Sequence, residues 1–169
     1  MRAMQLMELG SALRLQEITT PVPQAGEVLI QVAACGLNFA DTLMQKGTYQ
    51  EKHDLPATLG MELSGTIVAM GADVSAEASR LQVGQRVVAN PGIGGLAEYA
   101  AVPNRSCVPI PDQMPFTDAA AFLVAYASSQ MALDHRAQLR AGERLLVLGA
   151  SGGVGLTAVE LGKLMGAEV

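Results

Sequence analysis

The spacing of apolar residues divides the chain into a strand-rich first part and a helical second part. Val28, Ile30 and Val32 occupy alternate positions, and this period of two predicts a β-strand with one buried face. Short β-rich segments recur between glycines and prolines: 27–33, 63–70, 86–89 and 97–102. Many short strands at close spacing predict a compact barrel-like or sandwich module.

Two stretches of the chain predict helices. A short helix is expected over residues 38–46, ended by Gly47. A second helical stretch is expected to begin near residues 115–118, with Thr117 as the N-cap, and to continue in one or two pieces to about Arg140. The change from strands to helices places a domain boundary in this region.

A glycine-rich turn, GASGGVG at 149–155, follows the apolar run 145–148, which is expected to be a strand. The turn leads into a helix expected over 154–165 and ended by Gly166. Strand, glycine turn and helix are the opening of a nucleotide-binding crossover unit, which needs roughly 30 residues to complete. The chain reaches Val169 where the second strand would begin, so we expect only half of such a unit.

Composition narrows the class of protein. Half of the residues are hydrophobic and 16% are charged, which allows a substantial core, and the net charge of −5 argues against a general affinity for nucleic acid or anionic membranes. No apolar run reaches the ~18 residues needed to span a bilayer. Cys35 and Cys107 match no metal-binding or redox spacing, and are expected to be buried thiols. We therefore expect a soluble cytoplasmic protein.

The glycine turn carries the main candidate site. Phosphate groups bind at helix N-termini, where free N–H groups and the helix dipole favour negative charge, and glycine permits their close approach. The candidate cofactor-binding residues are Ser151, Gly152, Gly153, Val154 and Gly155. The alternative interpretation is a strand-to-helix turn that binds no ligand.

The chain as a whole resembles the medium-chain dehydrogenase/reductase superfamily, and within it the zinc-free quinone oxidoreductase branch. The resemblance rests on six motifs in this order: PQAGEV (23–28), CGLNFAD (35–41), LGMELSG (59–65), VGQRV (83–87), GLAEY (95–99) and GASGGVG (149–155). It implies a GroES-like β-rich barrel domain over residues 1–118. The start of a Rossmann dinucleotide-binding domain, truncated after its first βα unit, is implied over residues 119–169.

The resemblance also predicts that the protein holds no zinc. The positions at which zinc-dependent relatives have a cysteine and a histidine resemble Asn38 and Met61, whose amide and thioether cannot replace a thiolate and an imidazole on Zn²⁺. Two cysteines are also too few for the four-cysteine structural zinc lobe. His53 and His135 are isolated in the sequence and are expected at the surface or at a helix end.

Three side chains become candidate functional residues through the resemblance. Asn38 is implied near the nicotinamide, although it could equally serve as a helix N-cap, and Tyr49 is implied in the substrate cleft unless it is simply a loop aromatic. Ser128 resembles a hydroxyl residue that lies beside the cofactor in relatives.

Asp41 and Glu62 are expected to hold the local backbone or to pair with a basic residue, with general acid–base catalysis as the alternative.

The implied function is an NADPH-dependent, zinc-independent oxidoreductase that transfers hydride to a quinone or an activated alkene, with NADH as an alternative cofactor. An enoyl-thioester or alkenal reductase uses the same hydride chemistry and is the close alternative. The partners implied are a small quinone or enone and, for the full-length enzyme, a second copy in a homodimer. We expect the 169 residues to be a fragment of that enzyme. If they are the complete protein, a non-catalytic binding module is the alternative.

Overall fold

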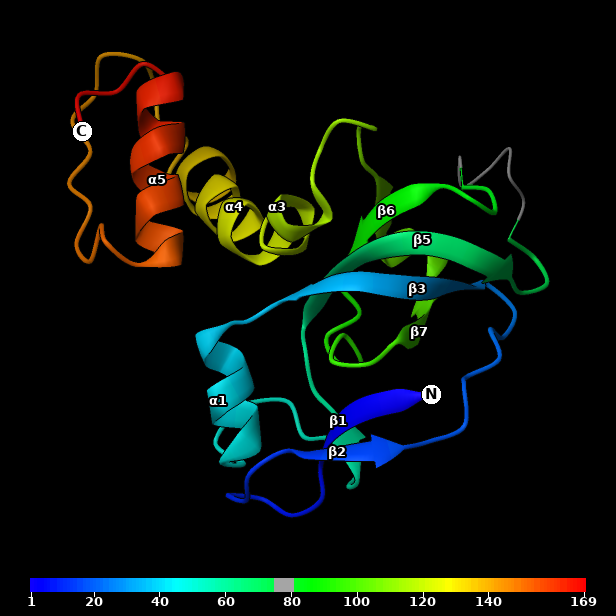
Figure 1. Ribbon diagram of the computed structural model, residues 1–169. Helices are drawn as coiled ribbons and strands as arrows, with labels where there is room; N and C mark the ends of the chain where they lie inside the picture. The colour runs from blue at the N-terminus through cyan, green and yellow to red at the C-terminus, as the bar shows by residue number, and fades with distance from the viewer. Residues whose placement is uncertain (75–80) are drawn as a thin grey trace. The chain divides into compact units, whose positions relative to one another are not determined.

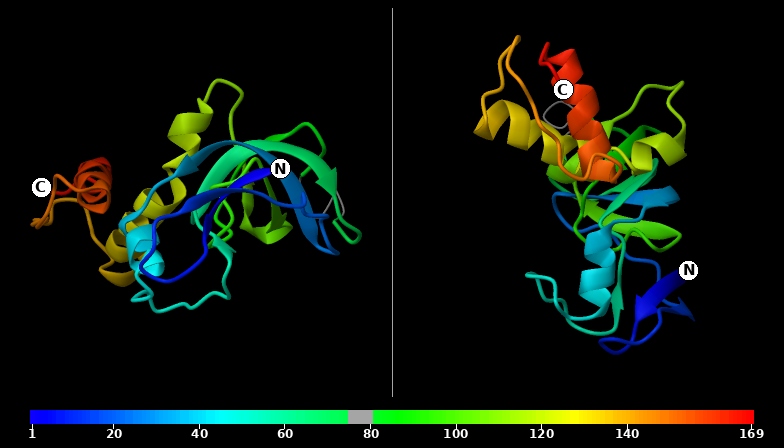
Figure 2. Two further views of the ribbon diagram at one scale, coloured as in Figure 1. Left: turned by 60° about the horizontal axis from the view of Figure 1, so that its bottom comes forward. Right: turned by 90° about the vertical axis from the view of Figure 1, so that its left-hand side faces the viewer.

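The computed structural model describes residues 1–74 and 81–169, which form two compact units, Met1–Ala121 and Phe122–Val169 (Figures 1 and 2). The first unit contains, in chain order, the elements β1 (Arg2–Leu6), β2 (Arg14–Glu17), β3 (Glu27–Gly36), α1 (Phe39–Gln45), β4 (Ala57–Thr58), β5 (Glu62–Met70), β6 (Arg86–Ala89), β7 (Tyr99–Pro103), the 3-10 helix η1 (Asn104–Ser106), β8 (Cys107–Pro109) and α3 (Phe116–Ala120). The second unit contains α4 (Leu123–Gln130), the π-helix η2 (Met131–Arg136) and α5 (Gly153–Leu164). None of the helices described here is long and apolar enough to cross a membrane.

The larger sheet of the first unit is antiparallel, with strand order β7-β3-β5-β6-β8 (Figure 1). Its β3 confirms the predicted alternation, because Val28 and Ile30 are fully buried while Gln31 is exposed. These two side chains join buried residues of the neighbouring strands, including Leu63 and Ile67 of β5, in one apolar core. The period of two therefore identifies the core face of the sheet.

The described strands form two open sheets and no closed barrel, so the predicted barrel-like or sandwich module is confirmed as a β-rich unit with two sheets. The smaller sheet has the order β2-β1-β4, and an isolated bridge between Ala3 of β1 and Ala97 is the point at which it meets the segment before β7. Closure of a barrel needs continuous pairing around the whole sheet. Because β1 pairs along its two edges with β2 and β4, its bridge to Ala97 does not extend into a ladder.

The predicted helix at residues 38–46 is confirmed as α1, which has Asn38 as its N-cap and Lys46 as its C-cap. Gly47 follows with φ of 70°, a left-handed conformation that favours glycine and ends the helix. Leu6, Met44 and Leu59 form a second, smaller apolar cluster beside this helix. The cluster holds α1 against the small sheet.

The second helical stretch differs from the expectation at both ends. Thr117 was predicted as an N-cap, but α3 begins at Phe116 with Pro115 as the capping residue, so Thr117 lies inside the first turn. Proline suits this entry because it has no N–H that the helix start would leave unpaired. At the other end the helix stops at Arg136. Gln138 then takes a positive φ of 52°, which ends the helical conformation before the predicted Arg140.

The predicted strand at 145–148 is absent from the described structure. A parallel bridge joins Arg144 to Glu168, and the N–H of Leu145 donates to the Glu168 carbonyl at 2.8 Å. Leu146 and Leu148 are 83% and 85% exposed. A strand is defined by a ladder to its neighbours, and a single bridged pair is too short to form one.

Arg86 of β6 ties the sheet to the segment that leads into α3. Its guanidinium donates to the carbonyl oxygens of Pro111, Asp112 and Met114, and it lies 4.2 Å from the ring centroid of Phe116. The planar, five-donor guanidinium suits this arrangement, and a lysine ammonium cannot reproduce it.

We predict that Arg86→Lys lowers the free energy of unfolding by about 1–2 kcal/mol, because at least one carbonyl loses its donor and the ring loses its stacked cation. Urea denaturation measures the change. Arg105→Lys, at an exposed position of η1, is the control and should leave stability unchanged. Equal stability of the two variants would contradict the assigned role of Arg86.

Candidate functional site

The glycine turn of the second unit has a backbone that only glycine permits at two positions. Gly149 has φ of 71°, and its carbonyl accepts a hydrogen bond from the N–H of Gly152 at 3.0 Å. A Cβ at Gly155 would lie 2.2 Å from the Gly149 carbonyl oxygen. The first turn of α5 therefore packs directly on the turn that precedes it.

The outer side of the same turn is open. A Cβ built at Gly153, the first residue of α5, meets nothing within 4 Å, and Gly152 is the extended N-cap before it. Ser151, Gly152, Gly153 and Val154 are exposed. The N-terminus of α5 thus offers free N–H groups on an accessible surface without side chains in front of it, which fits a nucleotide phosphate.

Two buried hydroxyls hold α5 against α4. Ser129 Oγ lies 2.7 Å from Thr157 Oγ1 and donates to the Val154 carbonyl at 2.8 Å, while Thr157 Oγ1 donates to the Ala125 carbonyl at 3.2 Å. The predicted cofactor residue Ser128 is exposed, and its hydroxyl donates to the Val124 carbonyl one turn earlier in its own helix. Sequence reasoning missed Ser129, which holds the start of α5 in place, and the role of Ser128 stays a prediction.

We predict opposite effects for alanine at two positions of the turn. Gly155→Ala should lower stability by about 1–3 kcal/mol, because the new methyl group collides with the Gly149 carbonyl. Gly153→Ala meets open space in a helical position and should be neutral or stabilising by up to about 1 kcal/mol. Amide hydrogen exchange of α5 measures the change in stability in both variants. Similar exchange rates in Gly155→Ala and Gly153→Ala would contradict the described packing.

A second set of functional candidates surrounds the N-terminus of α1 in the first unit. The N–H of Asn38 donates to Asp41 Oδ2 at 2.9 Å, and the side chain of Asn38 faces the N–H of Asp41, the reciprocal arrangement of a capping box. The other carboxylate oxygen of Asp41 accepts the N–H of Gly60 at 3.1 Å. Asp41 thus holds the local backbone, as the sequence predicts.

Glu62 lies at the start of β5 and is 2% exposed. Its Oε1 accepts a hydrogen bond from Asn38 Nδ2 at 2.9 Å, which brings together two residues that are 24 positions apart. The structure therefore gathers Asn38, Asp41 and Glu62 into one hydrogen-bonded group. The N-cap role of Asn38 is confirmed, and its part in binding or catalysis stays a prediction.

Asn38 lines a hollow of about 290 Å³ together with the apolar side chains Leu13, Leu37, Leu59 and Leu96. Asp41, Thr42 and Gln45 complete the wall, and the Asp41 carboxylate in it accepts hydrogen bonds from two backbone N–H groups. Such a hollow suits a molecule that has an apolar part against the leucines and a few polar atoms near the polar side chains.

Tyr49 is not among the residues that line this hollow. It packs instead against the small apolar cluster of Leu6, Met44 and Leu59. The role of Tyr49 in the substrate cleft stays a prediction.

Metal-ligating side chains are scattered. Within residues 1–74 and 81–169, no three or more histidine, cysteine, aspartate or glutamate residues lie together as a metal site would require. Met61 packs against the small apolar cluster, as a hydrophobic side chain does. His135 is exposed near the end of η2, as predicted, whereas His53 is partly buried and its Nε2 is covered without a hydrogen-bond partner in the described part of the chain.

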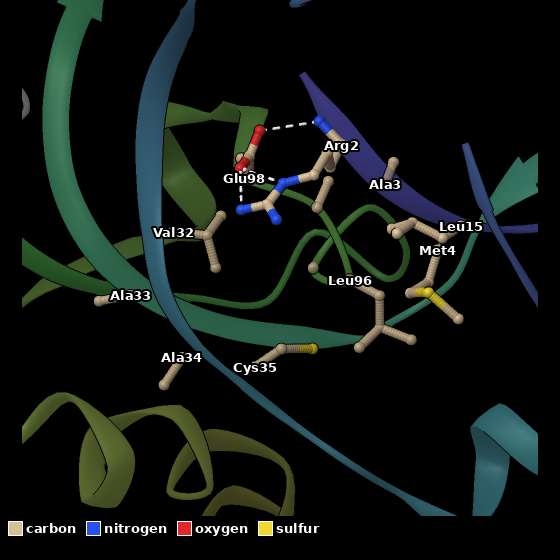
Figure 3. A pocket seen from close by; sticks show the side chains of 12 residues that line it. Arg2, Ala3, Met4, Leu15, Val32, Ala33, Ala34, Cys35, Leu96 and Glu98 are labelled. Carbon is tan, nitrogen blue, oxygen red and sulfur yellow. Dashed lines mark hydrogen bonds and ion pairs between the residues drawn. The ribbon is translucent and has the colours of Figure 1, made fainter. Parts of the chain in front are cut away.

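Cys35 lies at one side of a shallow hollow that also contains an ion pair between Arg2 and Glu98 (Figure 3). Two hydrogen bonds from Arg2, one from its N–H and one from its guanidinium, lower the pKa of Glu98. Burial, followed by the carboxylates of Asp41 and Glu62, raises the pKa of the Cys35 thiol from 9.0 to about 12. This thiol is therefore protonated and unreactive at neutral pH.

We predict that stability falls as pH rises from about 9 towards 12. Burial also raises the pKa of Cys107 from 9.0 to about 12, so in this window both thiols stay protonated in the folded chain and ionise in the unfolded one. The stabilisation is fully present below pH 9. Urea titrations at several pH values across this window measure the free energy of unfolding. It should fall less steeply with pH in the double variant Cys35→Ala/Cys107→Ala than in the wild type. Equal dependence on pH in the two proteins would contradict the raised pKa values.

The first unit contains two antiparallel sheets, and the second contains a glycine turn before a helix. A comparison with known proteins identifies the family to which this chain belongs. The alcohol dehydrogenase GroES-like domain family matches residues 24–112. The chain belongs to this family, and it is similar to quinone oxidoreductases. This confirms the family predicted from the six motifs.

Individual relatives cover nearly the whole chain. The human quinone oxidoreductase is 39% identical over 173 residues, which span 100% of this chain and 51% of that protein. The quinone oxidoreductase of Thermus thermophilus, a structure described with its NADPH complex, has a TM-score of 0.86 and 38% identity over 99% of this chain and 51% of its own. The CurK enoyl reductase has a TM-score of 0.87 and 33% identity over 98% and 52%. The chain spans about half the length of these relatives.

Proposed function

We propose that this protein acts as an NADPH-dependent, zinc-independent oxidoreductase that reduces a quinone or an activated alkene. The observation that carries the proposal is the turn at residues 149–155, where Gly155 allows close packing inside while Gly153 leaves the N-terminus of α5 open outside. Close packing of the turn and an open helix N-terminus are two of the features that a nucleotide pyrophosphate site needs. Similarity to quinone oxidoreductases, one of them described with NADPH, supports both the reaction and the cofactor.

In this proposal, each group of residues has a role in binding the cofactor or the acceptor. A bound nicotinamide nucleotide supplies the hydride. The N–H groups at the start of α5 bind its phosphates, and Ser129 and Thr157 keep that helix in place through their buried hydrogen bonds. Asn38 offers an amide beside an apolar hollow, which would orient the oxygen of an uncharged acceptor. Tyr49 and Ser128 are proposed as further contacts to substrate and cofactor.

Zinc independence is proposed from the chemistry of two positions. Asn38 and Met61 stand where a thiolate and an imidazole would be needed, and the Asn38 amide is engaged with Glu62. Activation of a carbonyl oxygen would then rest on hydrogen bonds from the protein.

A second candidate function is reduction of enoyl thioesters, favoured by the similarity to the CurK enoyl reductase. The two functions share the hydride step and differ in the acceptor. NADH as cofactor, assembly as a homodimer and a cytoplasmic location stay predictions. The intact mass of the protein from its natural source tests the expected greater length.

We predict that the protein quenches or shifts NADPH fluorescence in a saturable way and consumes NADPH with a small quinone. Gly153→Ala should weaken nucleotide binding about tenfold or more, because its methyl group stands where the phosphate approaches, while stability is retained. Leu164→Ala, at the exposed far end of α5, is the control.

Three outcomes decide between the alternatives. Saturable binding that Gly153→Ala weakens supports the oxidoreductase, and comparison of a quinone with a crotonyl thioester selects the acceptor. Binding that is insensitive to Gly153→Ala would contradict the assigned site. Absence of nucleotide binding by the full-length protein would favour the non-catalytic binding module.

A further inference from the structure

The carboxamide of Asn38 is hydrogen-bonded at its nitrogen and lies over the first turn of α1, where the N–H of Asp41 donates to the Asn38 backbone carbonyl at 3.0 Å. Nδ2 donates to Glu62 Oε1 at 2.9 Å, and the side chain also faces the N–H of Asp41 in the capping box. A carboxylate accepts hydrogen bonds and a backbone N–H donates them. The chemistry of the two neighbours therefore selects the orientation of the amide, with nitrogen towards Glu62 and oxygen towards the helix.

This orientation determines what Asn38 can offer to a ligand. Its oxygen faces the helix N-terminus and one amide hydrogen is donated to Glu62, so one N–H of the side chain remains without a partner among the described residues. Asn38 lines the hollow together with Leu13, Leu37 and other side chains, both apolar and polar. A ligand in that hollow would meet a hydrogen-bond donor beside leucine side chains.

We propose that Glu62 is a positioning residue that fixes Asn38 as a hydrogen-bond donor towards the carbonyl oxygen of a ligand in this hollow. The proposal rests on the proposed function, in which that ligand is a quinone or an enone. An amide side chain can donate or accept a hydrogen bond, and the proposal assigns Asn38 the role of donor. The hydrogen bond would strengthen as negative charge develops on the oxygen during reduction.

The surroundings of Glu62 suit a fixed positioning group. Glu62 is 2% exposed, and it begins β5 shortly after Gly60, whose N–H is bound by Asp41. The same carboxylate of Asp41 binds the N–H of Asn38. The Asp41 side chain thus sets the distance between Asn38 and the start of β5, where Glu62 lies.

Nuclear magnetic resonance of the protein labelled with ¹⁵N-asparagine tests the orientation without nucleotide, so a failure of NADPH binding leaves this result unaffected. The other asparagines are Asn90 and Asn104, and Asn38→Ser identifies the Asn38 signals. We expect slow hydrogen exchange of the Asn38 side-chain amide. Glu62→Leu should speed this exchange roughly tenfold or more, and the isosteric Glu62→Gln by less, because it retains a neutral acceptor.

Ser64→Ala is the matched control. Ser64 is fully buried two positions along the same strand, and its hydroxyl donates to the Phe116 carbonyl at 2.6 Å, away from Asn38. This variant loses a buried hydrogen bond and should leave Asn38 exchange unchanged. Equal exchange in Glu62→Leu, Glu62→Gln and Ser64→Ala would overturn the proposal.

A pair of probes tests the donor role. Cyclohexanone and methylenecyclohexane have the same ring, and only the first has an acceptor oxygen. Cyclohexanone should shift the Asn38 amide signals in the wild type and in Ser64→Ala, and much less in Glu62→Leu. A response to both probes of equal size, or a response to neither, would contradict the donor role.

Discussion

The carboxylate of Asp41 is the constraint on which the first unit depends around its site. It accepts the N–H of Asn38 at the start of the same helix and the N–H of Gly60 from a distant segment. Hydrogen bonds to a charged acceptor are stronger than neutral ones, and the loss of a buried acceptor would leave two N–H groups unpaired. One buried side chain thus fixes both the start of α1 and the approach to β5, and so the distance from Asn38 to Glu62.

Close contacts between backbones give the rest of this unit its shape. A Cβ at Gly36 would lie 2.3 Å from the Ala120 carbonyl, where α3 packs on the end of β3, and one at Gly65 would lie 2.1 Å from the Gln31 carbonyl between β3 and β5. Any side chain at either position would push two elements apart. The glycines of the motifs at 35–41 and 59–65 therefore serve packing, and Asn38 and Glu62 take their positions from it.

Local patterns predicted the elements whose stability is local. The period of two identified the core face of β3. The helix over 38–46 was bounded correctly because its N-cap, Asn38, and the Gly47 that ends it are adjacent in sequence to the helix itself. Features that depend on distant partners were not predictable. The apolar run at 145–148 has the composition of a strand but lacks a ladder, because only the preceding Arg144 forms a bridge, to Glu168.

The candidate site shows the same division at the level of single atoms. The capping box between Asn38 and Asp41 spans three positions and can be read from the sequence, whereas the hydrogen bond from Asn38 to Glu62 spans 24 and needs the fold. On α4 the difference between Ser128 and Ser129 is one residue, yet one step rotates the side chain by roughly 100° around the helix. As a result, the hydroxyl of Ser128 is exposed and bonded to its own helix, whereas the hydroxyl of Ser129 is buried and bonded to α5. A motif can therefore name the helix that carries a functional hydroxyl, but only packing selects which of two adjacent hydroxyls faces the neighbouring helix.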